Sequence, residues 1–373
     1  MNLRDGKKHV LADIAAGNCV VMKSDPGIGK TDVSRNVIFP AFAAMHRGKR
    51  VGLCRHFMAY RQDVDAAGIP YKGTIQVGDK TFTVTDPSMP GWYISEEGIP
   101  ASEYDIVMLI LEEWGQATPD AKKAHTPIAL EGGVDKWRLP PGSARLILTN
   151  LDPRDGVTKE HDFTINRWAE YPFQGDVNVW VEDFADKTYS HGGRDWLTMP
   201  ATKAWAKQNP LIMFEKKPAK QGPWCTPRSL CAADRYTQAI AEQNNNVIPI
   251  EDMGYVEGVA GKIGMAATQS FVNTLRSKLT LPSYEDIVAD PAGTDVPTKA
   301  DLIMLLTYEL AGLCQVEHVN ECLTYMGRLP KDMSVTFVSS LLRRDYKAVI
   351  NDPAMQKWIN RNASLLSVIS SLS

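Results

Sequence analysis

The feature that most constrains the fold is an apolar segment followed by a glycine-rich turn and then by a helical pattern. Cys19–Met22 predicts a buried strand, Ser24–Thr31 reads Ser-Asp-Pro-Gly-Ile-Gly-Lys-Thr, and a helical stretch continues to about residue 47. Glycines let backbone N–H groups approach a phosphate closely, and the start of a helix adds the positive end of its dipole. The order strand, loop, helix therefore predicts an α/β protein with a phosphate-binding loop.

Two residues of this loop carry its chemistry. Lys30 is placed to reach the β- and γ-phosphates of a nucleoside triphosphate, and Thr31 to hold Mg²⁺. The full pattern is Gly-x-x-x-x-Gly-Lys-Ser/Thr, and Ser24 stands where that pattern has its first glycine. The alternative is a chance glycine-rich turn with an exposed lysine. The candidate nucleotide-contacting residues are Ser24, Asp25, Pro26, Gly27, Ile28, Gly29, Lys30, Thr31 and Asp32.

Polar residues follow two further predicted strands. The apolar run Asp105–Leu111 ends in Glu112 and Glu113, and Arg145–Asn150 ends in an amide. Ligands of open α/β sheets bind at the carboxyl ends of the strands. We expect Glu112 to join Thr31 in holding Mg²⁺, Glu113 to polarise the attacking water, and Asn150 to orient it. Alone, these residues also fit two solvated acids that cap a strand and an asparagine that forms a turn.

Strands alternate with helices over the first half of the chain, which predicts a parallel α/β sheet. Further strands are expected at Val51–Cys54 and, as the fifth, at Val177–Val181. Residues 63–100 are rich in Gly, Pro and Asp and read as an insertion with short strands, and Gly132–Pro141 reads as a hairpin. From about residue 183 the strand pattern ends, and helices are expected at 200–215, 226–243, 257–279 and 299–371.

This pattern predicts three regions. They are an α/β nucleotide-binding core over 1–183 with inserts at about 63–100 and 131–141, a helical lid over 184–280, and a C-terminal helical region over 281–373.

Two arginines stand out by position. Arg167 precedes the expected fifth strand, and Arg228 lies at the expected start of a helix. A planar guanidinium suits phosphate oxygens, although each arginine alone also fits a surface salt bridge.

The order of these features resembles that of MoxR-type AAA+ ATPases, over roughly residues 5–280 and more faintly in the tail. Lys23–Thr31 resembles the Walker A motif and Leu111–Ala117 the Walker B motif. Further matches are Asn150 to sensor 1, Asn166–Trp168 to the arginine finger, Thr226–Ser229 to sensor 2, Asp65–Pro70 to the helix-2 insert and Glu131–Pro140 to the pre-sensor-1 hairpin.

The resemblance implies an ATPase that binds ATP and Mg²⁺, forms a homo-oligomeric ring, usually a hexamer, and remodels protein partners, often with a von Willebrand factor A protein. It implies the catalytic residues Glu113, Asn150, Arg167 and Arg228, with Arg167 acting in trans and Arg228 from the subunit's own lid. Two departures, Ser24 for glycine and Glu112 for aspartate, would slow hydrolysis rather than abolish nucleotide binding. Gly115-Gln116 also departs from the family pattern, so no role is carried onto it.

Composition limits the alternatives. The net charge is −3, so a polybasic nucleic-acid binder is not expected, and no apolar run reaches the roughly 18 residues of a membrane helix. The N-terminus lacks the pattern of a signal peptide, so the expected location is the cytoplasm. The six cysteines lack zinc-site spacing. Four basic clusters read as solvated faces: Lys7-Lys8, Lys122-Lys123, Lys216-Lys217 with Lys220, and Arg343-Arg344.

Two other functions stay open. One is a nucleic-acid motor of the same superfamily, for which Lys72 and Lys80 in the first insert are the only basic residues. The other is a nucleotide-binding scaffold with weak turnover, suggested by Ser24 and Glu112.

Overall fold

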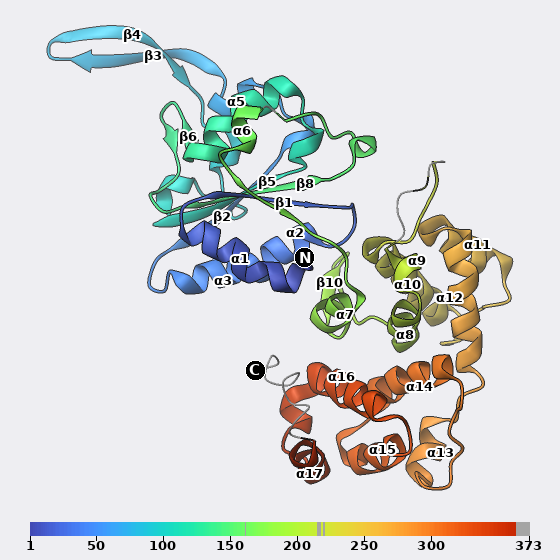
Figure 1. Ribbon diagram of the computed structural model, residues 1–373. Helices are drawn as coiled ribbons and strands as arrows, with labels where there is room; N and C mark the ends of the chain where they lie inside the picture. The colour runs from blue at the N-terminus through green and yellow to red at the C-terminus, as the bar shows by residue number, and fades with distance from the viewer. Residues whose placement is uncertain (161, 215–217, 219–220, 363–373) are drawn as a thin grey trace. The chain divides into compact units, whose positions relative to one another are not determined.

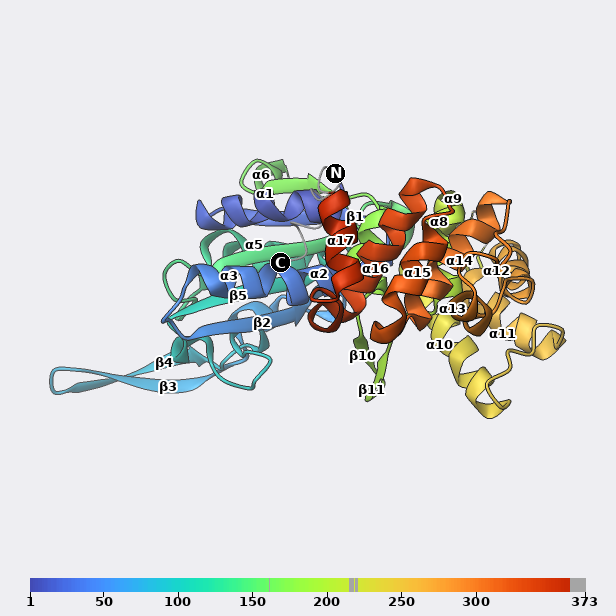
Figure 2. The ribbon, with the colours of Figure 1, turned by 90° about the horizontal axis from the view of Figure 1, so that it is seen from below.

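The computed structural model describes residues 1–160, 162–214, 218 and 221–362. The chain divides into two compact units, Met1–Gly175 and Asp176–Ser373. Figures 1 and 2 show the units from two directions. The described part of the chain contains no helix that is both long and apolar enough to cross a bilayer.

Unit 1 is built on a five-stranded sheet in which every strand runs parallel to its neighbours, in the order β2-β5-β8-β1-β9. Every residue of β5 is buried, as expected for a central parallel strand that is covered on both faces. The strands are β1 (Cys19–Ser24), β2 (Val51–Phe57), β5 (Ile106–Glu112), β8 (Ala144–Asn150) and β9 (Ala169–Pro172).

Helices cover both faces of this sheet (Figure 1). On one face, Val10 and Phe42 pack with the strand residues Val20 and Ile110. On the other face, Ile128 of α5 packs with Leu109 and neighbouring strand residues. The helices are α1 (Leu3–Ala15), α2 (Lys30–Val33), a π-helix (Ser34–Ile38), α3 (Phe39–Met45), α4 (Val64–Ala67), α5 (Pro119–Glu131) and α6 (Asp162–Ile165), with 3-10 turns at Met58–Tyr60, Gly91–Tyr93, Ala101–Glu103, Trp114–Gln116 and Pro153–Asp155.

Two hairpins leave the sheet where inserts are predicted. The first, β3 (Pro70–Val77) with β4 (Lys80–Pro87), forms a long two-stranded ribbon that projects from unit 1 (Figure 2). The second, β6 (Gly133–Val134) with β7 (Trp137–Arg138), is short.

Unit 2 is mainly helical and has two buried cores that share α14. Leu305 and Tyr308 face one core, whereas Leu306 and Leu310 face the other, which explains why Leu302–Leu313 is so apolar. The helices are α7 (Val177–Trp180), a π-helix (Val181–Ala185), α8 (Pro200–Gln208), α9 (Pro210–Met213), α10 (Pro227–Gln243), α11 (Met253–Ile263), α12 (Met265–Lys278), α13 (Tyr284–Ala289), α14 (Ala300–Leu313), a 3-10 turn (Val316–His318), α15 (Val319–Met326), α16 (Lys331–Val349) and α17 (Pro353–Arg361).

Two secondary-structure predictions are wrong. Val177–Val181 is helical rather than the fifth strand, because Asp176 caps a helix by accepting hydrogen bonds from the backbone N–H groups of Asn178 and Val179. The fifth strand is β9 instead. Strands also continue beyond residue 183, where β10 (Tyr189–His191) pairs with β11 (Arg194–Trp196) in a hairpin.

Two of the basic clusters are solvated only in part: Lys123 is exposed as predicted, but Lys122 is buried and Arg343 and Arg344 are half-buried. Lys122 is 1% exposed, and its ammonium contacts Glu160. Arg343 contacts Asp186 and Glu182, and Arg344 donates hydrogen bonds to the backbone carbonyls of Ala311, Gly312 and Cys314 at the end of α14. These cations satisfy buried acceptors rather than facing water. Residues 215–217, 219–220 and 363–371, which belong to the predicted helices or to the lysine cluster, lie outside the described residues.

Candidate functional site

The glycine-rich loop connects the carboxyl end of β1 to the amino end of α2. Gly27 and Gly29 have φ values of +81° and +104°, in the left-handed region that glycine adopts without steric cost. A Cβ added to Gly29 would meet no atom within 4 Å, so no other group packs against the loop at this point. Consecutive N–H groups in such a loop form an anion-binding concavity. The side chain of Asp32, by contrast, is exposed and accepts a hydrogen bond from Asn36 on the helix.

Lys30 bridges the loop and the neighbouring strand. Its ammonium lies 2.6 Å from Ser24 Oγ and 3.0 Å from Asn150 Oδ1, and it also contacts the backbone carbonyl of Asp25 at 3.2 Å. Ser24 and Asn150 are register partners at the ends of β1 and β8. Because these acceptors are neutral, a phosphate would be a stronger partner for the same ammonium.

Ser24, which departs from the usual glycine, has a structural reason to be tolerated. The residue is completely buried, and its hydroxyl donates to the backbone carbonyl of Asp25 at 2.7 Å while it accepts from Lys30. Its backbone does not have a positive φ, so no glycine is required there.

Thr31 and Glu112 lie against each other across two elements. The Thr31 hydroxyl donates to Glu112 Oε2 at 2.9 Å, and Glu112 is 4% exposed at the end of β5. Hydroxyl and carboxylate oxygens are ligands that Mg²⁺ accepts, usually together with phosphate oxygens and water. Among the described residues no group of three or more His, Cys, Asp or Glu side chains could hold a metal by itself. The pair therefore fits a magnesium ion that is held mainly by a nucleotide.

Glu113 occupies a different environment from Glu112. It follows the buried strand with φ 54° and ψ 35°, a left-handed conformation that is uncommon for a residue with a side chain, and it is exposed. The two adjacent acids thus divide into one buried carboxylate beside Thr31 and one that reaches solvent. Backbone strain of this kind is often found at functional sites.

The turn after Glu113 is held firmly in place. A Cβ on Gly115 would lie 2.3 Å from Thr149 Oγ1, so only glycine lets this turn approach β8 so closely. The carbonyl of Gly115 accepts from the N–H of Thr158 at 2.8 Å, and the Trp114 indole donates to Glu160 at 3.1 Å. These contacts fix the backbone that carries the two acids.

Sequence reasoning missed Arg55, which is central to the charge balance of the site. Its guanidinium contacts Glu112 Oε1 at 2.5 and 2.6 Å and Glu96 at 2.6 Å, and Arg35 contacts the other oxygen of Glu96 at 2.8 Å. Burial opposes the charge on Glu96, but the hydrogen bonds from Arg55 and Arg35 hold its pKa below the usual range. The pattern in β2 gave no signal for Arg55 because its partner Glu112 is 57 residues away.

The two arginines predicted to act on phosphate occupy different units. In the parallel register Ala169 of β9 is opposite Val20, at the amino end of β1. Arg167 precedes Ala169 in the chain, so it lies near the amino end of β1. About 13 Å of strand separates Val20 from Ser24, the carboxyl end of β1 where the glycine-rich loop begins. Arg167 makes an exposed contact of 3.4 Å with Glu131. Arg228 belongs to unit 2 and is exposed in the first turn of α10, where Thr226 and Ser229 form a capping box.

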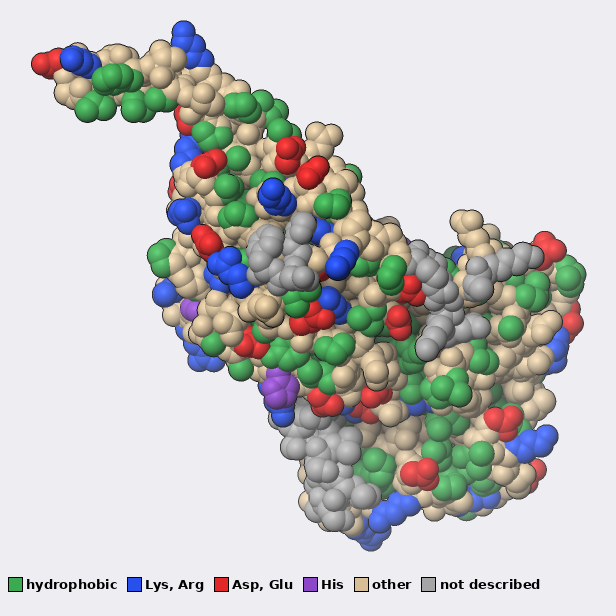
Figure 3. Space-filling view, turned by 45° about the horizontal axis from the view of Figure 1, so that its top comes forward, with side chains coloured by type: hydrophobic (Ala, Val, Ile, Leu, Met, Phe, Trp, Pro, Cys, Tyr) green, Lys and Arg blue, Asp and Glu red, His purple; other side chains and the backbone are tan. Residues whose placement is uncertain are grey.

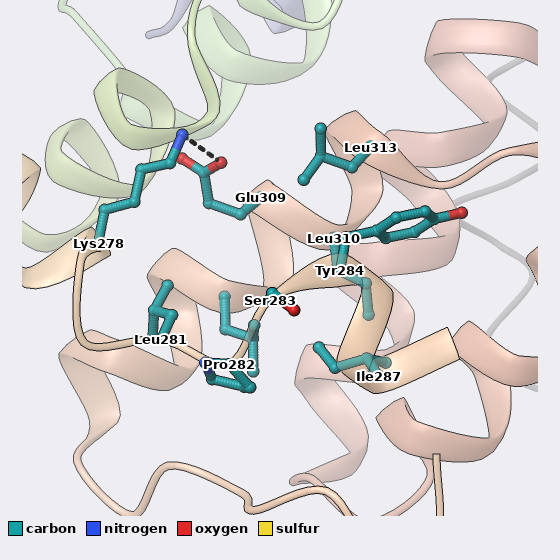
Figure 4. A pocket seen from close by; sticks show the side chains of 10 residues that line it. Lys278, Leu281, Pro282, Ser283, Tyr284, Ile287, Glu309, Leu310 and Leu313 are labelled. Carbon is teal, nitrogen blue, oxygen red and sulfur yellow. Dashed lines mark ion pairs between the residues drawn. The ribbon is translucent and has the colours of Figure 1, made fainter. Parts of the chain in front are cut away.

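A pocket of about 150 Å³ also lies in unit 2, between the end of α12, α13 and α14 (Figure 4). Leu281, Ile287 and Leu310 contribute to its apolar walls. Lys278 and Glu309 form an ion pair of 2.9 Å at its edge. None of the residues that the sequence predicts to bind nucleotide lines this pocket.

The parallel sheet with its strand–loop–helix unit, covered by helices on both faces and followed by helical regions, confirms the predicted α/β fold class. No protein-family model and no curated protein matches the chain.

Among solved structures, the chain is similar to an ATPase from Cytophaga hutchinsonii whose assignment is provisional (12% identity, TM-score 0.31, covering 73% of this chain and 88% of that chain). It is also similar to a RuvB mutant from Thermotoga maritima (10%, 0.36, 87% and 86%) and to NtrX from Brucella abortus in complex with ADP (12%, 0.31, 98% and 68%).

Proposed function

We propose that this chain binds ATP with Mg²⁺, hydrolyses it, and uses the hydrolysis to remodel protein partners as a ring-forming ATPase of MoxR type. The observation that carries the proposal is the convergence of Lys30, Thr31, Glu112 and Asn150 at the carboxyl ends of β1, β5 and β8. A cation, a hydroxyl, a carboxylate and an amide beside a glycine-rich loop are the groups that phosphoryl transfer needs.

The residues divide the work by their surroundings. The loop N–H groups and Lys30 would hold the phosphates, and Thr31 with Glu112 would hold Mg²⁺, which when bound neutralises charge on the phosphate oxygens. The exposed carboxylate of Glu113 would accept a proton from the attacking water, and the Asn150 amide would orient that water once a phosphate has drawn Lys30 toward itself.

Arg167 suits a role across a subunit interface better than a role in its own site. It lies at the amino end of β9, away from the loop that follows β1, and its exposed contact with Glu131 is easily exchanged. A ring would bring this edge of one subunit to the nucleotide of the next. Such arginine fingers stabilise charge in the transition state.

Protein is favoured over nucleic acid as the substrate by the charge of the longest insert. The projecting β3–β4 ribbon carries Lys72 and Lys80 but also Asp79 and Asp86, so its net charge is zero. Proteins that hold nucleic acid through its phosphates concentrate positive charge instead.

A nucleotide-binding scaffold with weak turnover is the second candidate, and one observation favours it. Glu112 is held by Arg55 at 2.5–2.6 Å, so the positive charge that Mg²⁺ would supply there is partly present already. A weakened hold on Mg²⁺ would leave binding intact and slow hydrolysis.

A turnover assay tests the proposal. The wild-type chain with ATP and Mg²⁺ should release phosphate, and Glu113→Gln should release it about 100-fold more slowly with ATP binding unchanged, since the amide cannot accept a proton. Stimulation by duplex DNA but not by an unfolded protein would favour the nucleic-acid motor. Binding of ATP with no turnover above that of Glu113→Gln would favour the scaffold.

A further inference from the structure

The β3–β4 ribbon has one apolar and one polar face. Residues that are directly opposite in an antiparallel pair share a face, and the register pairs Ile75 with Phe82 and Gly73 with Val84. The apolar face consists of Tyr71, Ile75, Val77, Phe82 and Val84. The other face carries Lys72, Thr74, Gln76, Thr81, Thr83 and Thr85.

The apolar face is not covered by the rest of unit 1. Four of its side chains are 48–61% exposed, and Figure 3 shows hydrophobic side chains gathered along one side of the ribbon. At about 100 Å² for each half-exposed aromatic or aliphatic side chain, this amounts to roughly 400 Å² of apolar surface. A contiguous patch of that size usually marks an interaction site.

The edges of the ribbon are also free to pair. β3 and β4 form a two-stranded sheet of their own, so within the described part of the chain no third strand flanks either of them. Proteins usually protect such edges with prolines or charges along the strand. Here Pro70 and Pro87 stand only at the base, and the charges of the apolar face, Lys80 and Asp86, lie at its two ends. The middle of the ribbon is therefore an unprotected template for another strand.

The base of the ribbon is anchored to unit 1. The N–H of Ile69 donates to Ser88 Oγ and the N–H of Ser88 to the Ile69 carbonyl, both at 2.9 Å. Asp86 accepts from Tyr71 Oη at 2.8 Å and forms an ion pair with Lys136, which lies between β6 and β7. A segment bound to the ribbon would thus be held at a defined place on the nucleotide-binding unit.

We propose that the ribbon captures an extended segment of a client polypeptide by strand addition. The segment would pair its backbone with a free edge and lay alternate apolar side chains over the face of Tyr71, Ile75 and Phe82. This inference rests on the proposed function, because it names the part of the chain that first holds the protein to be remodelled.

Charge and area favour this occupant over others. The ribbon has no net charge with which to hold a phosphate backbone. A stable subunit interface buries about 800 Å² on each partner, twice what the apolar face offers, so this face alone would not hold two copies together. A small apolar face with a free edge suits a weak and reversible contact with an unfolded segment.

The test measures binding of a fluorescent ten-residue peptide of alternating valine and threonine to the full chain by anisotropy. The variant Ile75→Thr/Phe82→Thr removes a directly opposed apolar pair, and Thr74→Ala/Thr83→Ala is its matched control on the polar face. We expect the first variant to weaken binding about tenfold or more, because buried apolar area drives the contact, and the control to bind within about twofold of wild type.

Three results would overturn the proposal: equal binding by Ile75→Thr/Phe82→Thr, equal binding of a peptide whose alternate backbone nitrogens are methylated, or competition by duplex DNA or by anionic lipid vesicles. ATP binding measured on the same samples reports whether unit 1 is folded. Peptide binding without ATP hydrolysis would contradict the proposed function alone, whereas hydrolysis without peptide binding would contradict only the role of the ribbon.

Discussion

Replacement of Arg55 by methionine gives a quantitative test of how the site is held together. The Arg55 side chain is 15% exposed, and its guanidinium makes two contacts of 2.5–2.6 Å with Glu112, whose side chain is 6% exposed. Loss of one partner leaves the other charge buried, which costs about 3–5 kcal/mol in well-buried pairs. Because Glu112 keeps its hydrogen bond from Thr31, we expect the lower end, about 3 kcal/mol.

Arg35→Met is the matched control, since Arg35 is 42% exposed and contacts Glu96 at the outer side of the same cluster. Loss of such an exposed pair costs less than about 1 kcal/mol. Urea unfolding of both variants, followed by circular dichroism, gives the two free energies. The thermal midpoint of unit 1 should fall by about 6–12 °C for Arg55→Met. Equal unfolding free energies for the two variants would refute the assignment of Arg55 as the buried counter-charge.

Three further outcomes are expected. Burial, with the neighbouring His125, lowers the pKa of His56 to about 3 in the folded chain. As pH falls below about 6.5, the unfolded chain therefore takes up a proton on His56 while the folded chain does not, which destabilises the folded state. Between pH 7 and pH 5, the free energy of unfolding should therefore fall by about 2 kcal/mol less for His56→Leu than for wild type, as measured by urea unfolding at both pH values. An equal fall for the two proteins would contradict this. Glu113→Gly should relieve the strain of the left-handed backbone and raise the stability of the folded chain by up to about 1 kcal/mol, measured by thermal unfolding. The rate of hydrolysis should fall, and an unchanged rate would exclude Glu113 as the base. Arg167→Ala should bind ATP but hydrolyse it poorly, and mixing it with Lys30→Ala should restore part of the activity, whereas subunit exchange without recovery would exclude a role in trans.

That the residues of the candidate site lie together was predictable, because they are local in sequence or end a strand. β1, β5 and β8 are apolar runs that end in polar residues, and a parallel sheet brings their carboxyl ends together without further information. The proximity of Lys30, Thr31, Glu112 and Asn150 follows from that arrangement. Arg55 was not predictable, because its ion pair with Glu112 depends on β2 lying next to β5 rather than on any pattern in β2.

The errors have physical causes too. Val177–Val181 is rich in β-branched residues, which favours a strand, but the Asp176 cap decides for a helix. The fifth strand, β9, is a four-residue edge strand with an alternating pattern too short to notice. The β10–β11 hairpin had a usable signal in Gly192-Gly193, both of which adopt positive φ between two short strands. Lys122 looked like part of a charged surface because its partner Glu160 is 38 residues away.

Titration calorimetry of ATP into the wild-type chain and into Lys30→Ala tests the central claim most directly. The Lys30 ammonium lies at the meeting point of the loop, Ser24 and Asn150, and its replacement leaves the phosphates without a side-chain cation in the loop. We predict saturable binding of one ATP per chain for wild type and no measurable binding for Lys30→Ala, with both proteins folded by circular dichroism. Equal affinity for the two proteins would contradict the assignment of this loop as the nucleotide site.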